Sequence, residues 1–231
     1  MKRFLMLSMP FAMLVSFLAA ASVNAQAPGE GIADRATAAT ETHNAKPDME
    51  NAVDKITLGA GCFWCVEAVF QRIEGVVKVE SGYMGGRNPN PTYKQICTGM
   101  TGHAEVIQVT FDPAEVLLDD LLKVFWQTHD PTTLNRQGAD VGTQYRSAVF
   151  YHNDQQRERA ELWKEKLNAA RAFASPIVTE ISPATEFYVA EDYHQNYFNL
   201  NQSNPYCRAV IPSKLKKLKK VFGEGLKEEY K

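Results

Sequence analysis

The chain has 231 residues, of which 45% are hydrophobic and 23% charged, and its formal net charge at pH 7 is −2. This composition is typical of a globular protein with enough apolar residues to bury the core of one domain. The charge balance gives no indication of a nucleic-acid partner, because a binding surface for phosphates needs an excess of basic residues.

The first 25 residues have the pattern of a secretory signal peptide. Lys2 and Arg3 precede an apolar run over residues 4–21, and Val23-Asn24-Ala25 then offers the small residues of a cleavage site. An uncleaved membrane anchor is the alternative, but the apolar run is short and is interrupted by serine and proline. We therefore expect export to the bacterial periplasm and no membrane insertion after cleavage.

Composition also separates the rest of the chain into three parts. Residues 26–54 contain almost no large apolar side chain, which is typical of a flexible linker that cannot bury surface. A folded domain is expected over residues 55–222, and residues 223–231 are expected to form a tail.

Hydrophobic periodicity predicts alternating strands and helices in the domain. Ile56-Thr57-Leu58 predicts a first strand, and apolar residues at helical spacing over residues 66–73 predict a helix after a glycine-rich turn. Val76–Tyr83 and His103–Phe111 read as strands separated by a long loop. The later predicted elements are a helix from Leu118 towards His129, a strand Tyr145–Tyr151, a long helix capped by Asn153 or Asp154, short strands at 177–181 and 187–189, and a short helix over 192–200.

This order predicts an α/β (α+β) fold, a two-layer sandwich with a ferredoxin-like split βαβ core and long loops. The lysine-rich C-terminal segment, residues 214–222, has leucines at helical spacing. Such a basic helix could lie on a membrane surface. We favour a terminal helix that docks by its leucines and leaves its lysines in water.

The stretch Gly61-Cys62-Phe63-Trp64-Cys65 carries the strongest chemical signal. Cys62 falls at the predicted helix start, where free backbone N–H groups and the helix dipole stabilise a thiolate, so its pKa is expected to fall. Cys65 follows within one helical turn and is close enough to pair with it. Four cysteines are too few for a disulfide scaffold in a chain of this size, so reactive thiols are favoured over structural cysteines or half of a metal site.

Glu105 shares strand parity with the apolar residues of the predicted strand His103–Phe111. A carboxyl group in a core-facing row is expected to be partly buried, which raises its pKa and lets it stay protonated near neutral pH. Parity alone leaves an exposed position at the strand end equally open. Tyr93 and Tyr145 occupy a loop and a strand start, from which their hydroxyls could point into the same site.

The neighbouring residue types suit one kind of substrate. Phe63 and Trp64 follow the candidate nucleophile, and aromatic rings beside a thiolate suit a small apolar group such as a methyl. A phenol and a carboxylic acid suit an oxygen that gains negative charge or leaves as water. A methyl sulfoxide fits this set, provided that the residues meet in space. His129, His152 and His194 lack metal-ligand spacing and are expected to be structural or exposed.

Seven short motifs follow one another across residues 55–212. Together they make the chain resemble the A-type peptide-methionine sulfoxide reductase family, whose members reduce the S epimer of methionine sulfoxide. The motifs are Gly61-Cys62-Phe63-Trp64, Gly82-Tyr83 with Gly85-Gly86, Pro91-Thr92-Tyr93, Gly102-His103-Ala104-Glu105, His129-Asp130-Pro131, Gly142-Thr143-Gln144-Tyr145-Arg146-Ser147 and Ala190-Glu191-Asp192-Tyr193-His194.

The resemblance implies a role for each candidate residue. Cys62 matches the nucleophile that attacks the sulfoxide sulfur and becomes a sulfenic acid. Glu105 matches the acid that protonates the oxygen, and Tyr93 and Tyr145 match the hydroxyls that hold it. The implied substrates are free methionine sulfoxide and oxidised proteins, and no cofactor is implied. The remaining matches are the methyl pocket, Phe63 and Trp64, and a supporting acidic residue, Asp140.

In its recycling cysteines the chain departs from the commoner pattern of the family. Many members have Gly where this chain has Cys65 and carry a resolving cysteine in a Gly-rich tail, whereas this tail is rich in lysine. We expect a Cys62–Cys65 disulfide, because proximity favours it, with Cys207 as the alternative resolving residue. Cys97 is expected to be a buried bystander. A thioredoxin-like donor in the periplasm would reduce the disulfide.

Two other classes of protein share a Cys-x-x-Cys pair. An exported thiol–disulfide oxidoreductase could use Cys62 and Cys65, but the chain lacks the usual Trp-Cys-Gly-Pro-Cys composition, and Glu105 would have no role. A non-catalytic zinc module is disfavoured, because no second cysteine pair stands at zinc-finger spacing.

Overall fold

The computed structural model describes residues 53–231. The predicted signal peptide and nearly all of the predicted linker lie outside the described residues. Within residues 53–231, no helix combines the length and the apolar character needed to cross a membrane.

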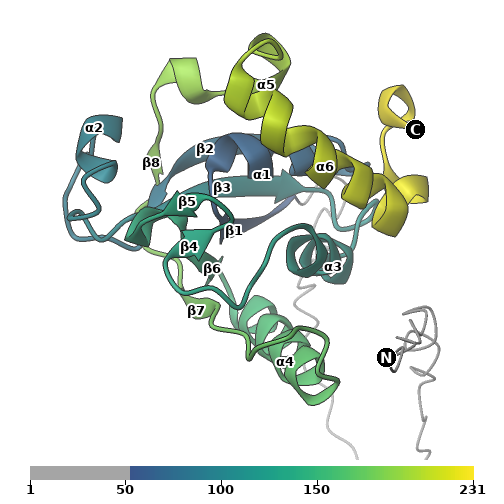
Figure 1. The fold of residues 1–231 in the computed structure, drawn as a ribbon. Helices are drawn as coiled ribbons and strands as arrows, with labels where there is room; N and C mark the ends of the chain where they lie inside the picture. Colours follow the sequence, from purple (N-terminus) through teal and green to yellow (C-terminus); the bar gives the residue numbers. More distant parts are fainter. Residues whose placement is uncertain (1–52) are drawn as a thin grey trace, which may run out of the picture. The chain divides into compact units, whose positions relative to one another are not determined.

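A mixed six-stranded sheet organises this part of the chain (Figure 1), with strand order β7-β6-β1-β3-β2-β8. A separate two-stranded ribbon pairs β4 with β5. The strands are β1 (Asp54–Ala60), β2 (Val76–Met84), β3 (Ala104–Phe111), β4 (Arg136–Gln137), β5 (Asp140–Val141), β6 (Ser147–Tyr151), β7 (Glu180–Pro183) and β8 (Tyr188–Val189).

The central strands form two interlocked split βαβ units. β3 is antiparallel to both β1 and β2, so β1 and β2 run parallel to each other with β3 between them. In the same way β1 is antiparallel to β3 and β6 and lies between them. The predicted α/β fold with a ferredoxin-like core is therefore confirmed. β7 extends the sheet parallel to β6, and β8 extends it antiparallel to β2.

Six α-helices complete the described chain. α6 packs against both α1 and α3, and α4 packs against β6 and β7 (Figure 1). The helices are α1 (Phe63–Phe70), α2 (Tyr93–Ile96), α3 (Leu118–Thr128), α4 (Asp154–Ala169), α5 (Tyr197–Leu200) and α6 (Pro205–Phe222).

Capping residues explain where the two longest helices begin. Asn153 precedes α4, and its side-chain oxygen accepts a hydrogen bond from the backbone N–H of Gln156 at 2.9 Å. Asn204 caps α6 by accepting from the N–H of Tyr206 at 2.9 Å, and Pro205 follows at the first helical position, where no N–H is needed. This cap fixes the helix that carries Cys207.

The core lies between the sheet and the helices, and β3 is buried at every position. Ile107 and Val109 face the helices, whereas Ala104 and Val106 point to the opposite face, where Phe187 covers them. α6 docks on the core through Ile211 and Leu218, while its lysines at positions 216, 217, 219 and 220 are exposed. The predicted docking by leucines is confirmed, because Leu218 is buried and Leu215 packs against the core, but the helix begins at Pro205, before the predicted segment.

The structure corrects several predicted elements, including a strand and a helix. The strand predicted from Tyr145 begins at Ser147, because Thr143–Tyr145 forms a 3₁₀ turn. The helix predicted over residues 192–200 is broken into a 3₁₀ turn and α5, because Asn196 adopts a left-handed conformation with φ 52°. A helix cannot run through that backbone conformation.

Truncation of a leucine on α3 provides a test of the packing. Leu121 is fully buried, whereas Leu117, just before the helix, is 62% exposed. We expect Leu121→Ala to lower the free energy of unfolding by about 2–5 kcal/mol, because it removes buried methyl groups and leaves a cavity. Leu117→Ala should change it by less than about 0.5 kcal/mol. Urea denaturation measures both, and equal effects would contradict the described core.

Candidate active site

Cys62 lies where β1 passes into α1, as the strand–turn–helix pattern predicts. Gly61 provides the turn with φ +91°, and a side chain on it would collide with Gln137. Cys62 is the N-cap residue of α1, and its carbonyl accepts from the N–H of Cys65 at 3.0 Å. The turn therefore presents Cys62 at the positive end of a helix whose other residues are almost all buried.

Three of the four cysteines lie in one cluster. Cys62 and Cys65 lie side by side, and Cys207 packs beside them from the first turn of α6. All four thiols are free in this structure. Cys97 lies outside the cluster at the C-cap of α2, and the prediction that it is buried is wrong: Ile96 fills the inward position of that short helix, and Cys97 faces solvent.

The environment of the thiol pair does not lower the pKa of Cys62, contrary to the sequence expectation. Burial raises the pKa of the Cys62 thiol, and the neighbouring Cys65 and Glu105 raise it further. The pKa of Cys65 is lowered, first by its hydrogen bond from Cys62 and, against its own burial, by the cation of Lys214 on α6.

Glu105 is buried beside the start of α1. Only 1% of the residue is exposed, and one carboxylate oxygen accepts from the backbone N–H of Phe63 at 3.1 Å. Burial raises the pKa of Glu105 to about 8, although the hydrogen bond from Phe63 opposes the shift. The burial predicted from strand parity is confirmed, and a carboxylic acid at this position holds its proton at neutral pH.

The two candidate tyrosines approach the same acid from different segments. Tyr93 begins α2, and Tyr145 ends the 3₁₀ turn before β6. Burial raises the pKa of both phenols, and the charge of Glu105 is the next cause for each. The structure therefore brings Tyr93, Tyr145 and Glu105 together, and both phenols remain hydrogen-bond donors over the physiological pH range.

Asp140 joins the cluster through a tyrosine that sequence reasoning did not single out. The hydroxyl of Tyr206 donates to the Asp140 carboxylate at 2.6 Å and lies 3.7 Å from the sulfur of Cys65. Tyr206 precedes Cys207 on α6, and Asp140 lies on β5. In the sequence, the only feature that indicated a role for Tyr206 in the site is its position next to Cys207.

The aromatic residues after Cys62 form a packed wall. Phe63 is 1% exposed and packs against Tyr93 with 6.4 Å between ring centroids. Trp64 is half-buried, stacks on Tyr197 at 3.8 Å with 9° between the ring planes, and donates its indole N–H to Nδ1 of His194 at 3.0 Å. This pair of contacts fixes both the plane and the rotation of the indole.

The three histidines have different places in the fold. His129 is structural: its ring nitrogens bond the Phe125 carbonyl at 2.6 Å and the Ser147 hydroxyl at 2.7 Å. His152 bonds Thr57 at 3.0 Å at the other end of the domain. His194 is buried within the site, and its Nε2 has no hydrogen-bond partner among residues 53–231. In that range no group of three or more His, Cys, Asp or Glu side chains is arranged to hold a metal ion.

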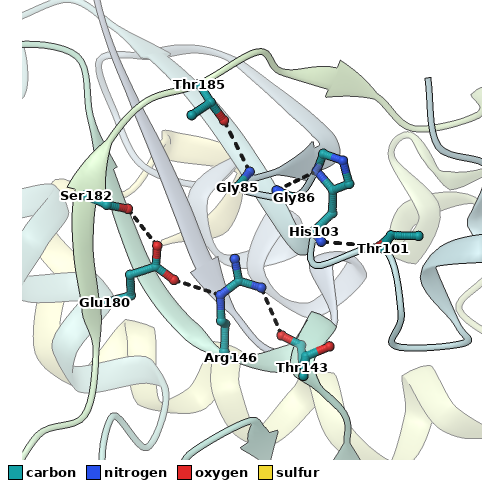
Figure 2. A network of polar contacts seen from close by, with 9 residues as sticks. All are labelled: Gly85, Gly86, Thr101, His103, Thr143, Arg146, Glu180, Ser182 and Thr185. Atoms are coloured by element: carbon teal, nitrogen blue, oxygen red, sulfur yellow. Dashed lines mark hydrogen bonds and ion pairs between the residues drawn. The ribbon is translucent and has the colours of Figure 1, made fainter. Parts of the chain in front are cut away.

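A polar network holds the loops that precede the two tyrosines (Figure 2). His103 accepts from the N–H of Gly86 at 3.1 Å and thereby ties the glycine-rich loop to the start of β3. Arg146 pairs with Glu180 at 2.8 Å and donates to the Thr143 carbonyl at 3.1 Å, as Figure 2 shows. Downstream of the first loop, the N–H of Tyr93 donates to Glu191 at 2.8 Å.

A buried acid beside paired thiols on an α/β scaffold is the arrangement of an oxidoreductase that works through cysteine. Comparison with known proteins agrees, because residues 54–226 match the family model described as "Peptide methionine sulfoxide reductase". The chain belongs to the peptide methionine sulfoxide reductase family, and it is an enzyme of that kind.

Individual relatives are similar over most of their length. Peptide methionine sulfoxide reductase MsrA 1 of Rhodopirellula baltica is 57% identical over 171 residues, covering 74% of this chain and 88% of the relative. The MsrA of Deinococcus radiodurans is 50% identical over 200 residues, covering 86% and 97%. Among solved structures, methionine sulfoxide reductase A of Corynebacterium diphtheriae has a TM-score of 0.59 at 41% identity, covering 66% of this chain and 76% of that chain.

Proposed function

We propose that the chain reduces the S epimer of methionine sulfoxide, free or in proteins, and thereby repairs oxidised proteins. One observation carries this proposal: a thiol pair, a carboxylic acid that is neutral at pH 7 and an aromatic wall converge at the start of α1. These three features match the three parts of the substrate, namely its sulfur, its oxygen and its methyl group.

In the first step the Cys62 sulfur attacks the sulfoxide sulfur. Glu105 gives a proton to the departing oxygen, which the hydroxyls of Tyr93 and Tyr145 hold, and Phe63 and Trp64 enclose the methyl group. The bond between the two sulfurs breaks as the hydroxyl passes to Cys62, so that methionine leaves and Cys62 becomes a sulfenic acid, and the proton lost from the Cys62 thiol replaces the one that Glu105 gave. Asp140 acts more indirectly, because it fixes the hydroxyl of Tyr206 beside Cys65.

In the second step Cys65 attacks the sulfenic acid of Cys62, which forms a disulfide and releases water. The position of Cys65 beside Cys62, one helical turn further along α1, supports Cys65 as the resolving residue. Cys207 is fully buried in the same cluster and is the alternative. A thioredoxin-like dithiol then reduces the disulfide. We further propose that the enzyme is exported to the bacterial periplasm, as residues 1–25 indicate.

Removal of the nucleophile tests the proposed chemistry. Cys62→Ser should lose essentially all reduction of the S epimer of dabsyl-methionine sulfoxide with dithiothreitol as reductant, because a hydroxyl is a far weaker nucleophile than a thiolate. Cys97→Ser, at the exposed cysteine outside the thiol cluster but beside Tyr93, is the comparison and should lose far less activity than Cys62→Ser. Full activity of Cys62→Ser would refute the proposal, and activity confined to disulfide substrates would favour a general thiol–disulfide oxidoreductase.

The proton donor can be tested by pH. Glu105, with a pKa of about 8, is protonated at pH 7 and loses its proton as the pH rises through 8. Because the Cys62 thiolate forms only at still higher pH, the single-turnover rate should rise with pH up to about 8 and then level off as the acid is lost, whereas Glu105→Gln should be slower by about 10²-fold at pH 7 and its rate should keep rising above pH 8. Glu115→Gln alters an exposed carboxylate and is the control. A Glu105→Gln rate within about twofold of wild type would remove Glu105 as the acid.

Separate cysteine variants distinguish the two candidates for resolution. Cys65→Ser should form one methionine per enzyme and then stop with a thioredoxin donor, because the variant lacks the thiol that attacks the sulfenic acid. Cys207→Ser should continue to turn over. Quench-flow product counts and thioredoxin-linked NADPH consumption measure the two behaviours, and arrest of Cys207→Ser alone would transfer the resolving role to Cys207.

A further inference from the structure

Glu67 is a buried carboxyl group without a cationic partner. It is 1% exposed on α1, and none of the ion pairs within residues 53–231 includes it. Burial raises its pKa to about 7. A carboxyl group in such a place is costly unless hydrogen bonds satisfy its oxygens.

Two backbone N–H groups of a distant segment satisfy Glu67. Its oxygens accept from the N–H of Asn196 at 2.8 Å and from the N–H of Tyr197 at 3.2 Å. Asn196 precedes α5 in a left-handed conformation and makes no side-chain cap of its own. Glu67 therefore caps α5 from another helix, and it binds the N–H of a residue in the left-handed conformation, which asparagine adopts more readily than most residues.

The segment that Glu67 holds is the one that orients Trp64. Tyr197 stacks on the indole, and His194 accepts its N–H. Trp64 and Glu67 stand three residues apart on α1 and so share one face of that helix. α5 packs on α1 along this face (Figure 1). The segment around His194 and Tyr197 therefore fixes the indole of Trp64. Glu67, one turn after Trp64 on α1, fixes that segment in turn.

The same segment has a second anchor that does not depend on Glu67. The side chain of Gln195 accepts from the N–H of Ser81 and donates to the Ser81 carbonyl, both at 2.9 Å. The segment therefore stays attached to β2 when Glu67 is changed. What Glu67 adds is the position of Tyr197, two residues after Gln195, against Trp64.

We propose that Glu67 is a positioning residue that sets the width of the methyl pocket by holding Tyr197 and His194 against Trp64. Because these contacts keep the pocket narrow, the enzyme would discriminate a methyl sulfoxide from a larger alkyl sulfoxide. This inference rests on the proposed function, because it takes Phe63 and Trp64 as the walls around the substrate methyl. A tight apolar pocket rejects one extra methylene, and a loosened wall accepts it more readily.

The test is the ratio of kcat/KM for methionine sulfoxide to kcat/KM for ethionine sulfoxide, measured with dithiothreitol. Glu67→Ala should lower this ratio about tenfold, chiefly through a higher KM for methionine sulfoxide. Glu67→Gln keeps one carbonyl oxygen as an acceptor and should fall between wild type and Glu67→Ala. Glu74→Ala changes an exposed glutamate just after α1 and is the matched control, for which the ratio should not change.

Circular dichroism first establishes that each variant is folded, and if Glu67→Ala is not, the nearly isosteric Glu67→Gln decides. A merely structural defect would lower activity on both substrates equally and leave the ratio unchanged. An unchanged ratio in a folded, active Glu67 variant would overturn the inference while leaving the proposed function intact. Failure of the wild-type enzyme to reduce methionine sulfoxide would instead overturn the proposed function.

Discussion

The hydrogen bond from the backbone N–H of Phe63 to the carboxylate of Glu105 joins the first turn of α1 to the central strand β3. It satisfies a helix-start N–H and a buried acid with one contact, and either group left alone would be costly. Because Cys62 precedes Phe63, the same contact sets the distance between the nucleophile and the acid. The aromatic wall, the thiol pair and the tyrosines are all arranged around this junction.

Burial decides the protonation of the site. It raises the pKa of Cys62 and of Glu105, although a helix start by itself favours a thiolate. The cation of Lys214 acts on both thiols of the pair from α6. A resting site of this kind keeps its protons, which suits a reaction that must deliver protons to an oxygen as it leaves the substrate.

Residues near the C-terminal end of the domain complete the active site that Cys62 and α1 begin. His194 and Tyr197 hold Trp64, and Tyr206 with Cys207 closes over Cys65. These residues stand about 130 positions or more after α1. In the opposite direction, Glu67 on α1 accepts hydrogen bonds from the backbone at the start of α5 and so holds that segment in place. The position of the Trp64 indole therefore depends on two sets of contacts: those that His194 and Tyr197 make with Trp64, and those that Glu67 makes with the start of α5.

The sequence by itself determined the order of the elements, the place of Cys62 at a helix start and the inward parity of Glu105, because these follow from local periodicity and turn chemistry. The seven motifs indicated the family from the sequence alone. Tertiary structure decided what depends on contacts between distant segments: the raised pKa of Cys62, the exposure of Cys97, and the presence of His194 and Tyr206 in the site. No local pattern encodes these, because burial and hydrogen-bond partners are properties of the packed chain.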